Sequence, residues 1–135
     1  MAEPGLIGFD IGGTKCAVTV GTAAGAIVET LRFPTKGSAA AMLDRLADGA
    51  RRLLAGHPSL AAAAAGVSCG GPLDSRRGMI LSPPNLPGWD EVPVVERLRS
   101  ALGVPCFLEN DANACALAEA RLGAGRGASS VVFCT

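Results

Sequence analysis

Two short polar segments, far apart in the sequence, each follow a largely apolar run. The first is Asp-Ile-Gly-Gly-Thr-Lys at residues 10–15, behind apolar residues 6–9. The second is Glu-Asn-Asp-Ala-Asn at residues 109–113, behind residues 104–108. A glycine turn exposes backbone amides that suit a phosphate, and a carboxylate at a strand end suits a general base. Together the segments hold the parts needed to move a phosphoryl group onto a sugar hydroxyl.

The glycines of the first segment are expected to open a hairpin rather than a helix. The segment therefore differs from a dinucleotide-binding fingerprint, and it lacks the residue order of a Walker A loop. Gly12 and Gly13 allow close backbone approach to an anion, while Thr14 offers a hydroxyl and Lys15 a cation. Asp10 is suited to hold a magnesium ion, directly or through water. A tight turn beside an unrelated acidic residue is the alternative explanation.

The second segment has a strong structural explanation, because Asn and Asp are preferred helix N-caps and a helix is predicted to begin there. Its position favours a functional role. Ligands in open α/β sheets bind beyond the carboxyl ends of the strands, where Asp10 and Asp111 are both expected. The positive end of a helix also favours negative charge on Asp111. Phosphoryl transfer needs only a modest base at this point.

A third candidate is the loop at residues 83–89, Pro-Pro-Asn-Leu-Pro-Gly-Trp. Its prolines hold Asn85 among rigid neighbours, which reduces the entropy lost on ligand binding. The amide of Asn85 offers both a donor and an acceptor to a sugar hydroxyl. For Trp89 we expect a core anchor rather than a sugar-stacking platform.

The elements that must position these residues follow from periodicity and turn residues. We expect antiparallel strands at residues 5–10, 16–20 and 26–33, then a helix from Ser38 to Gly56. The alanine run in residues 60–69 favours a helix by propensity, but its Pro and Gly neighbours favour a strand. The rest is predicted as a long ordered loop at residues 70–90, helices at 93–102 and 111–122, and strands at 104–109 and from 131. This order predicts an α/β, ribonuclease-H-like lobe with a mixed five-stranded sheet.

The composition and net charge of the chain argue against several classes of protein. The chain has 135 residues, 49% of them hydrophobic, a net charge of zero and no Tyr. These features argue against a nucleic-acid-binding surface, and no apolar stretch approaches the ~20 residues of a membrane span. Without a secretory signal at the start, we expect a cytoplasmic protein. The five cysteines form no Cys-x-x-Cys pair, so we expect reduced thiols, with Cys16 and Cys106 buried in strands, and no zinc site within this chain.

Four segments in the same order resemble the ROK family of bacterial sugar kinases and repressors. They are residues 10–15, 66–74 (Gly-Val-Ser-Cys-Gly-Gly-Pro-Leu-Asp), 84–89 and 109–113. The resemblance covers essentially the whole chain and implies the actin/hexokinase-type ATPase fold, in which sugar and ATP meet between two lobes. Residues 1–135 would then form the N-terminal lobe, with the second lobe absent from this chain.

The resemblance also implies roles for individual residues. Residues that match the first phosphate-binding motif for ATP are Asp10, Gly12, Gly13, Thr14 and Lys15, with Asp10 serving Mg²⁺, through water. Residues that match sugar contacts are Gly71, Asn85, Asn110 and Asp111. Asp111 also matches the general base for the sugar 6-hydroxyl. The family's second phosphate motif, adenosine-binding region and zinc ligands are not matched in this chain.

The resulting expectation is ATP-dependent phosphorylation of a glucose-like hexose by a complete protein that forms a homodimer, with the isolated chain inactive. One alternative is a sugar-responsive transcriptional repressor of the same family. About five residues precede the first predicted strand, too few for a helix-turn-helix head. A second alternative is a sugar-binding fragment without catalytic activity. The motifs leave the identity of the hexose open.

Overall fold

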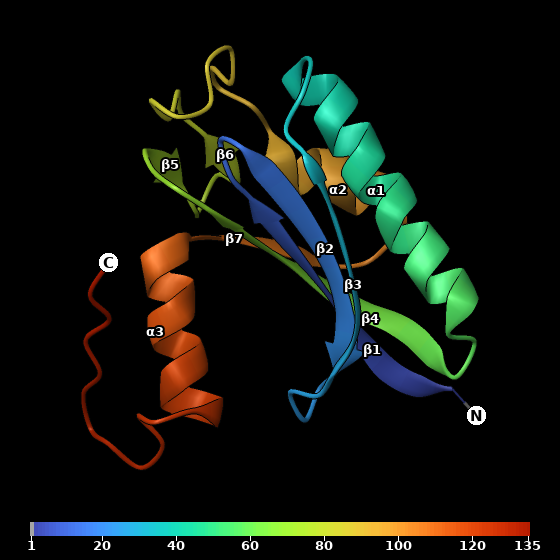
Figure 1. Ribbon diagram of the computed structural model, residues 1–135, viewed down its shortest axis with the longest axis vertical. Helices are drawn as coiled ribbons and strands as arrows, with labels where there is room; N and C mark the ends of the chain where they lie inside the picture. Colours follow the sequence, from blue (N-terminus) through green and yellow to red (C-terminus); the bar gives the residue numbers. More distant parts are fainter. Residues whose placement is uncertain (1) are drawn as a thin grey trace.

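A mixed five-stranded sheet forms the centre of the computed structural model, which describes residues 2–135 (Figure 1). The strand order is β3-β2-β1-β4-β7. The strands are β1 (Glu3–Ile11), β2 (Lys15–Thr22), β3 (Ile27–Pro34), β4 (Leu60–Cys69) and β7 (Cys106–Asn110). β1, β2 and β3 form an antiparallel meander, whereas β1, β4 and β7 run parallel. The predicted mixed sheet and its meander are confirmed.

Alternation of side chains explains the central strands. In β1, Ile7, Phe9 and Ile11 are buried on one face, while Gly8 and Asp10 lie on the other. β4 contains the alanine run and pairs with β1 on one side and β7 on the other. Strand pairing on both sides thus outweighs the helix propensity of alanine, and the strand predicted for residues 60–69 is confirmed.

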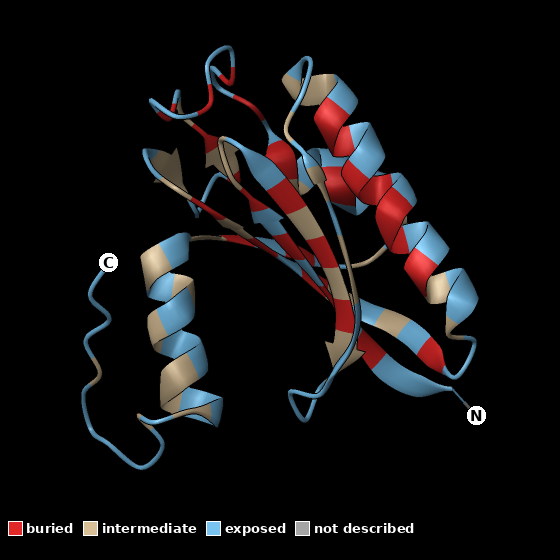
Figure 2. Ribbon diagram, viewed as in Figure 1, coloured by how far each residue is buried: buried red, intermediate tan, exposed pale blue. Residues whose placement is uncertain are grey.

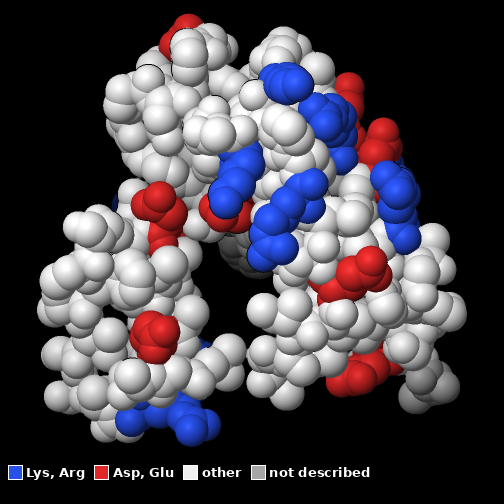
Figure 3. All heavy atoms as spheres, viewed as in Figure 1, with Lys and Arg blue, Asp and Glu red and all other residues white. Residues whose placement is uncertain are grey.

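Helices α1 (Ala39–Gly56) and α2 (Val94–Leu102) cover one face of the sheet, and buried residues line the inner side of α1 (Figure 2). The hydroxyl of Ser38 caps α1 by accepting from the Ala41 amide at 3.1 Å, as predicted. Gly103, in a left-handed conformation, ends α2. Lys and Arg side chains mix with Asp and Glu over the outer side of this layer (Figure 3).

The loop predicted at residues 70–90 is ordered and contains a short hairpin, formed by β5 (Leu73–Asp74) and β6 (Met79–Ile80). Ile80, Leu86 and Trp89 of this loop belong to the hydrophobic core, and Trp89 is only 2% exposed. The core role predicted for Trp89 is therefore confirmed. These anchors hold Asn85 in place from both sides.

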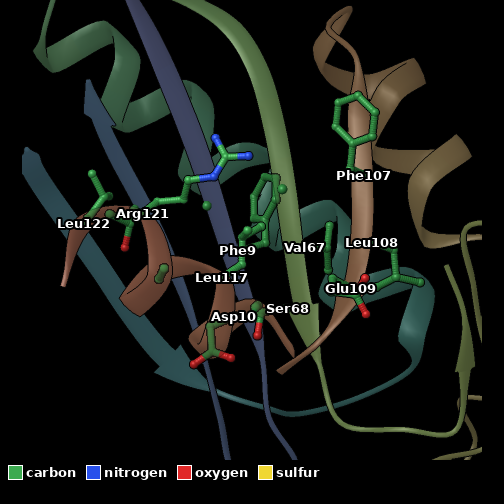
Figure 4. A pocket seen from close by; sticks show the side chains of 15 residues that line it. Phe9, Asp10, Val67, Ser68, Phe107, Leu108, Glu109, Leu117, Arg121 and Leu122 are labelled. Carbon is green, nitrogen blue, oxygen red and sulfur yellow. The ribbon is translucent and has the colours of Figure 1, made fainter. Parts of the chain in front are cut away.

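Helix α3 (Asp111–Leu122) lies on the opposite face of the sheet, and none of its residues is buried. A mainly apolar cavity of about 520 Å³ separates it from the sheet. In Figure 4, Leu117 and Leu122 of α3 line this cavity, and Asp10 and Ser68 lie together at one end. Phe107 of β7 remains 66% exposed on this face. The sheet is thus thoroughly covered on the α1 side only.

The strand predicted from residue 131 is wrong, because residues 131–135 are irregular. In Figure 1 this segment runs beside α3, and none of the strands in the described sheets pairs with it. Its apolar residues favour a strand only where a neighbour exists, and Val132 is 85% exposed. Within residues 2–135, no helix has the length and apolar character needed to cross a membrane.

Candidate functional site

Three parallel strands end in register at one edge of the sheet. Ile11 of β1 pairs with Cys69 of β4, and Cys69 pairs with Asn110 of β7. Beyond this row lie the Gly12–Lys15 turn, the Gly70–Gly71 turn and the start of α3. The two segments singled out in the sequence therefore lie at the same edge, where open α/β sheets bind ligands.

The carboxylates of Asp10 and Asp111 belong to one site. Both line a cavity of about 470 Å³, together with Ser68 and Cys115. Burial raises the pKa of Asp10, the negative charge of Asp111 raises it further, and the ammonium of Lys15 opposes both effects. This coupling indicates that the two carboxylates lie close enough for their charges to interact.

Crowding explains the two glycines of the hairpin turn. The Gly12 amide donates to the Lys15 carbonyl at 3.1 Å, and a Cβ on Gly12 would lie 2.7 Å from that oxygen. A Cβ on Gly13 would collide with the carbonyl oxygen of Asn85 and lie 3.0 Å from its Cβ. Within the described residues, the amides of Gly13 and Thr14 donate to no protein acceptor. The turn therefore has unpaired donors to offer an anion.

The predicted sugar-contacting side chains converge on the Gly70–Gly71 turn. A Cβ built on Gly70 would lie 3.8 Å from Asp111 Oδ2 and 4.0 Å from Asn85 Nδ2. A Cβ on Gly71 would lie 3.8 Å from Asn110 Nδ2. Because glycine has no side chain, this turn leaves space between the amides of Asn85 and Asn110 and the carboxylate of Asp111.

The capping explanation for the second segment applies to Asn110 rather than Asp111. Asn110 Oδ1 accepts from the amides of Ala112 at 3.0 Å and Asn113 at 3.3 Å, which makes Asn110 the N-cap. Its Nδ2 remains directed toward Gly71. Asp111 is the first helical residue, and its Oδ1 accepts from the Ala112 amide at 2.8 Å. Its Oδ2 is the oxygen nearer to Gly70.

Glu109 supports this arrangement, although the sequence pattern suggested no role for it. Its Oε1 accepts from the Asn110 amide at 2.8 Å and from Asn113 Nδ2 at 3.0 Å. These two bonds fix the step from β7 into α3, and with it the directions of Asn110 and Asp111. The motif contained Glu109, but only the hydrogen bonds distinguish its positioning role from ligand contact.

The residues at this edge fit a magnesium ion that arrives with a nucleotide. The described residues contain no group of three or more His, Cys, Asp or Glu side chains arranged to hold a metal. Mg²⁺ in nucleotide sites keeps several waters and uses one or two carboxylates besides the phosphates. Asp10, which precedes the turn with unpaired amides, provides such a carboxylate.

Comparison with known proteins agrees with this geometry. Residues 6–135 match the model of the ROK family. A glucokinase from Streptomyces coelicolor is 34% identical over 129 residues, which are 96% of this chain and 39% of that protein. A transcriptional regulator from Mycobacterium bovis is 35% identical over 125 residues, 92% of this chain and 28% of that protein. The chain thus spans about two fifths of its glucokinase relative.

Solved structures of ROK family proteins also resemble this chain. The ROK hexokinase from Thermus thermophilus superposes with a TM-score of 0.80 and 39% identity, over 91% of this chain and 40% of that chain. A ROK family glucokinase from Streptomyces griseus, solved with glucose and AMPPNP, gives a TM-score of 0.80 and 35% identity, over 91% of this chain and 38% of that one. The predicted actin/hexokinase-type ATPase fold is confirmed, and the chain belongs to the ROK family.

Proposed function

We propose that this chain is the N-terminal lobe of an ATP-dependent hexose kinase that phosphorylates the 6-hydroxyl of a glucose-like sugar. The observation that carries the proposal is the convergence of Asn85, Asn110 and Asp111 on the Gly70–Gly71 turn, beside a phosphate-type turn. The glucokinase relatives and the structure solved with glucose and AMPPNP support it. The remaining sugar contacts and the adenosine pocket would come from a second lobe.

On the nucleotide side, the unpaired amides of Gly13 and Thr14 would bind phosphate oxygens, with the ammonium of Lys15 adding positive charge. Asp10 would hold the magnesium ion, through water, which neutralises charge on the phosphates. Because the charges of Asp10 and Asp111 interact, the magnesium ion would also affect Asp111. A positive charge near Asp10 would offset the repulsion between the two carboxylates.

On the sugar side, Asn85 Nδ2 and Asn110 Nδ2 would donate to ring hydroxyls, and Asp111 Oδ2 would accept the proton of the attacking 6-hydroxyl. Its carboxylate is oriented by the Ala112 amide and by the start of α3. Glu109 fixes that helix start from behind. The orientation of its carboxylate and its position beside the Gly70–Gly71 turn support the proposed role of Asp111 as the general base.

Replacement of the base tests the proposal. In the complete two-lobed protein, Asp111→Asn should lower kcat by roughly 10²-fold or more, because an amide cannot accept the hydroxyl proton. Steady-state kinetics with ATP and a panel of glucose, mannose, fructose and N-acetylmannosamine would measure kcat and identify the preferred hexose. Sugar affinity, measured by isothermal titration, should change little because the amide still fills the site. A near-normal kcat would leave Asp111 a structural helix residue.

A second candidate is a sugar-responsive transcriptional regulator, which the similarity to the Mycobacterium bovis regulator favours. Such a protein would bind the sugar at the same edge of the sheet without turnover. Assays of ATP turnover and of DNA binding with and without sugar separate the two. Sugar-dependent ADP formation supports the kinase, and sugar-sensitive DNA binding without ADP formation supports the regulator.

A further inference from the structure

Thr35, the residue directly after β3, makes two hydrogen bonds to the Gly12–Lys15 turn. Its hydroxyl donates to the Gly12 carbonyl oxygen at 2.7 Å. Its amide donates to the Thr14 carbonyl oxygen at 3.0 Å. Thr35, which lies outside the turn, therefore holds two of the turn's carbonyl groups in place.

Cys16, the residue after the turn, contacts both Thr35 and Gly12. Its Sγ lies 3.2 Å from Thr35 Oγ1 and 3.9 Å from the Gly12 carbonyl oxygen. Because the Thr35 hydroxyl donates to Gly12, Thr35 Oγ1 can accept from the Cys16 thiol, which is also within donating distance of the Gly12 carbonyl oxygen. Cys16 is only 1% exposed and Thr35 is half-buried, so these hydrogen bonds are partly shielded from water. Hydrogen bonds that follow one another in such surroundings strengthen each other.

These bonds determine where the Gly13 amide points. In a trans peptide the C=O and N–H groups point in opposite directions, and the Gly12–Gly13 bond is trans. Holding the Gly12 carbonyl toward Thr35 therefore turns the Gly13 amide away from Thr35. Among residues 2–135 no hydrogen bond joins the Lys15 amide to this carbonyl, so the hairpin's own backbone does not replace Thr35.

We propose that Thr35 is a positioning residue for the nucleotide phosphates. It fixes the Gly12–Gly13 peptide so that the Gly13 amide is oriented in advance for a phosphate oxygen. The inference rests on the proposed function, since it concerns the nucleotide side of that same site. The side-chain bonds of Thr35 go to Gly12 and Cys16 and not to the sugar-side residues, so its loss should affect ATP more than the sugar.

The test compares Thr35→Val with Thr35→Ser in the complete two-lobed protein. Valine keeps the shape and the backbone amide but removes the hydroxyl, whereas serine keeps the hydroxyl. We expect Thr35→Val to raise KM for ATP about 5- to 10-fold, the scale of one lost hydrogen bond, with less than about a twofold change in KM for the sugar. Thr35→Ser should remain close to wild type. Where valine prevents folding, Thr35→Ala removes the hydroxyl without added bulk.

Thr30→Val is the matched control. Thr30 also lies in β3, and its hydroxyl pairs with that of Thr19 at 2.9 Å, with no bond to the turn. If Thr35→Val and Thr30→Val have the same KM for ATP, the role of Thr35 is refuted while the kinase proposal stands. An equal rise in both substrate KM values would likewise reduce Thr35 to a general structural role. Absence of sugar-dependent ATP turnover in the wild type would overturn the proposed function, and this inference with it.

Discussion

Gly13 and Asn85 are in direct backbone contact, although one belongs to the turn after β1 and the other to the proline-rich loop. A Cβ on Gly13 would overlap the Asn85 carbonyl oxygen. The turn assigned to the phosphates therefore packs directly against the loop assigned to the sugar. Any shift of the one must move the other, since the loop is anchored in the core by Leu86 and Trp89.

This contact makes Gly13→Ala a sensitive substitution. The added methyl group would force the turn and the loop apart, so we expect the free energy of unfolding to fall by about 1–3 kcal/mol. Affinity for sugar should fall as well as affinity for ATP. Gly66→Ala is the control, because a Cβ on Gly66 in β4 meets nothing within 4 Å. Urea unfolding measures stability, and equal stability of the two variants would contradict the close contact.

The two sides of the site should separate in binding measurements. Lys15→Ala should weaken ATP binding and leave sugar binding nearly intact, because it removes a cation from the phosphate side. Asn85→Ala should weaken sugar binding by about 1–3 kcal/mol, the cost of leaving a hydrogen-bonding partner unpaired. Isothermal titration of the complete protein with ATP and with the sugar measures both affinities. Unchanged sugar affinity in Asn85→Ala, with reduced sugar affinity in Lys15→Ala, would reverse the assignment.

Local sequence signals predicted the five strands of the main sheet and helices α1, α2 and α3, because periodicity, caps or flanking turn residues marked each of them. Ser38 marked the start of α1, and the prolines and glycines around residues 60–69 distinguished a strand from a helix. The strand predicted at residues 131–135 is wrong for the opposite reason, since strand formation depends on a neighbouring strand that local sequence does not reveal.

The site was predicted in part for a similar reason. Strand ends and motif order indicated that Asp10 and Asp111 would meet. The capping of α3 by Asn110 rather than Asp111, and the contacts of Glu109 and Thr35, depend on individual hydrogen bonds. Those bonds follow from side-chain directions, which no spacing rule specifies.

Thiol reactivity offers a test on the chain itself. Burial, together with the charges of Asp111 and Asp10 and the nearby Cys16, raises the pKa of Cys69 to about 12. At pH 8 its thiolate fraction would be on the order of 10⁻⁴, and the thiol is fully covered. Iodoacetamide should therefore modify the exposed Cys115 and Cys134 of the folded chain and spare Cys69. Peptide mapping gives the sites, and rapid labelling of Cys69 in native conditions would contradict the packing.

The raised pKa of Asp10 predicts a pH dependence of stability. Its proton is held more tightly in the folded than in the unfolded chain, so its contribution is fully present below the unfolded value of 3.8. That contribution is lost as the pH rises through the folded pKa. Asp10→Asn should therefore gain stability relative to wild type between pH 3 and pH 7. The gain should be less than about 1 kcal/mol, because the carboxylate is only partly buried and solvent screens its charge.

Two variants check the origin of that effect. Asp44→Asn, on the exposed outer side of α1, is the control for removing a carboxylate. Asp111→Asn should reduce the pH effect at Asp10, since the charge of Asp111 contributes to the raised pKa. Urea unfolding at several pH values gives the difference. If Asp10→Asn gained no more stability than Asp44→Asn over this range, the coupling would be refuted.

The isolated chain should not phosphorylate sugar at a measurable rate. Catalysis of phosphoryl transfer depends on positioning and on charge stabilisation from both sides of the phosphoryl group, and these residues provide one side. Exposed apolar residues such as Ile27, Phe107 and Leu117 should also make the isolated chain self-associate. Purified residues 1–135 with ATP, Mg²⁺ and glucose should release only background ADP, and size-exclusion chromatography should show oligomers. Sugar-dependent turnover by this chain alone would refute its assignment as one half of a two-lobed enzyme.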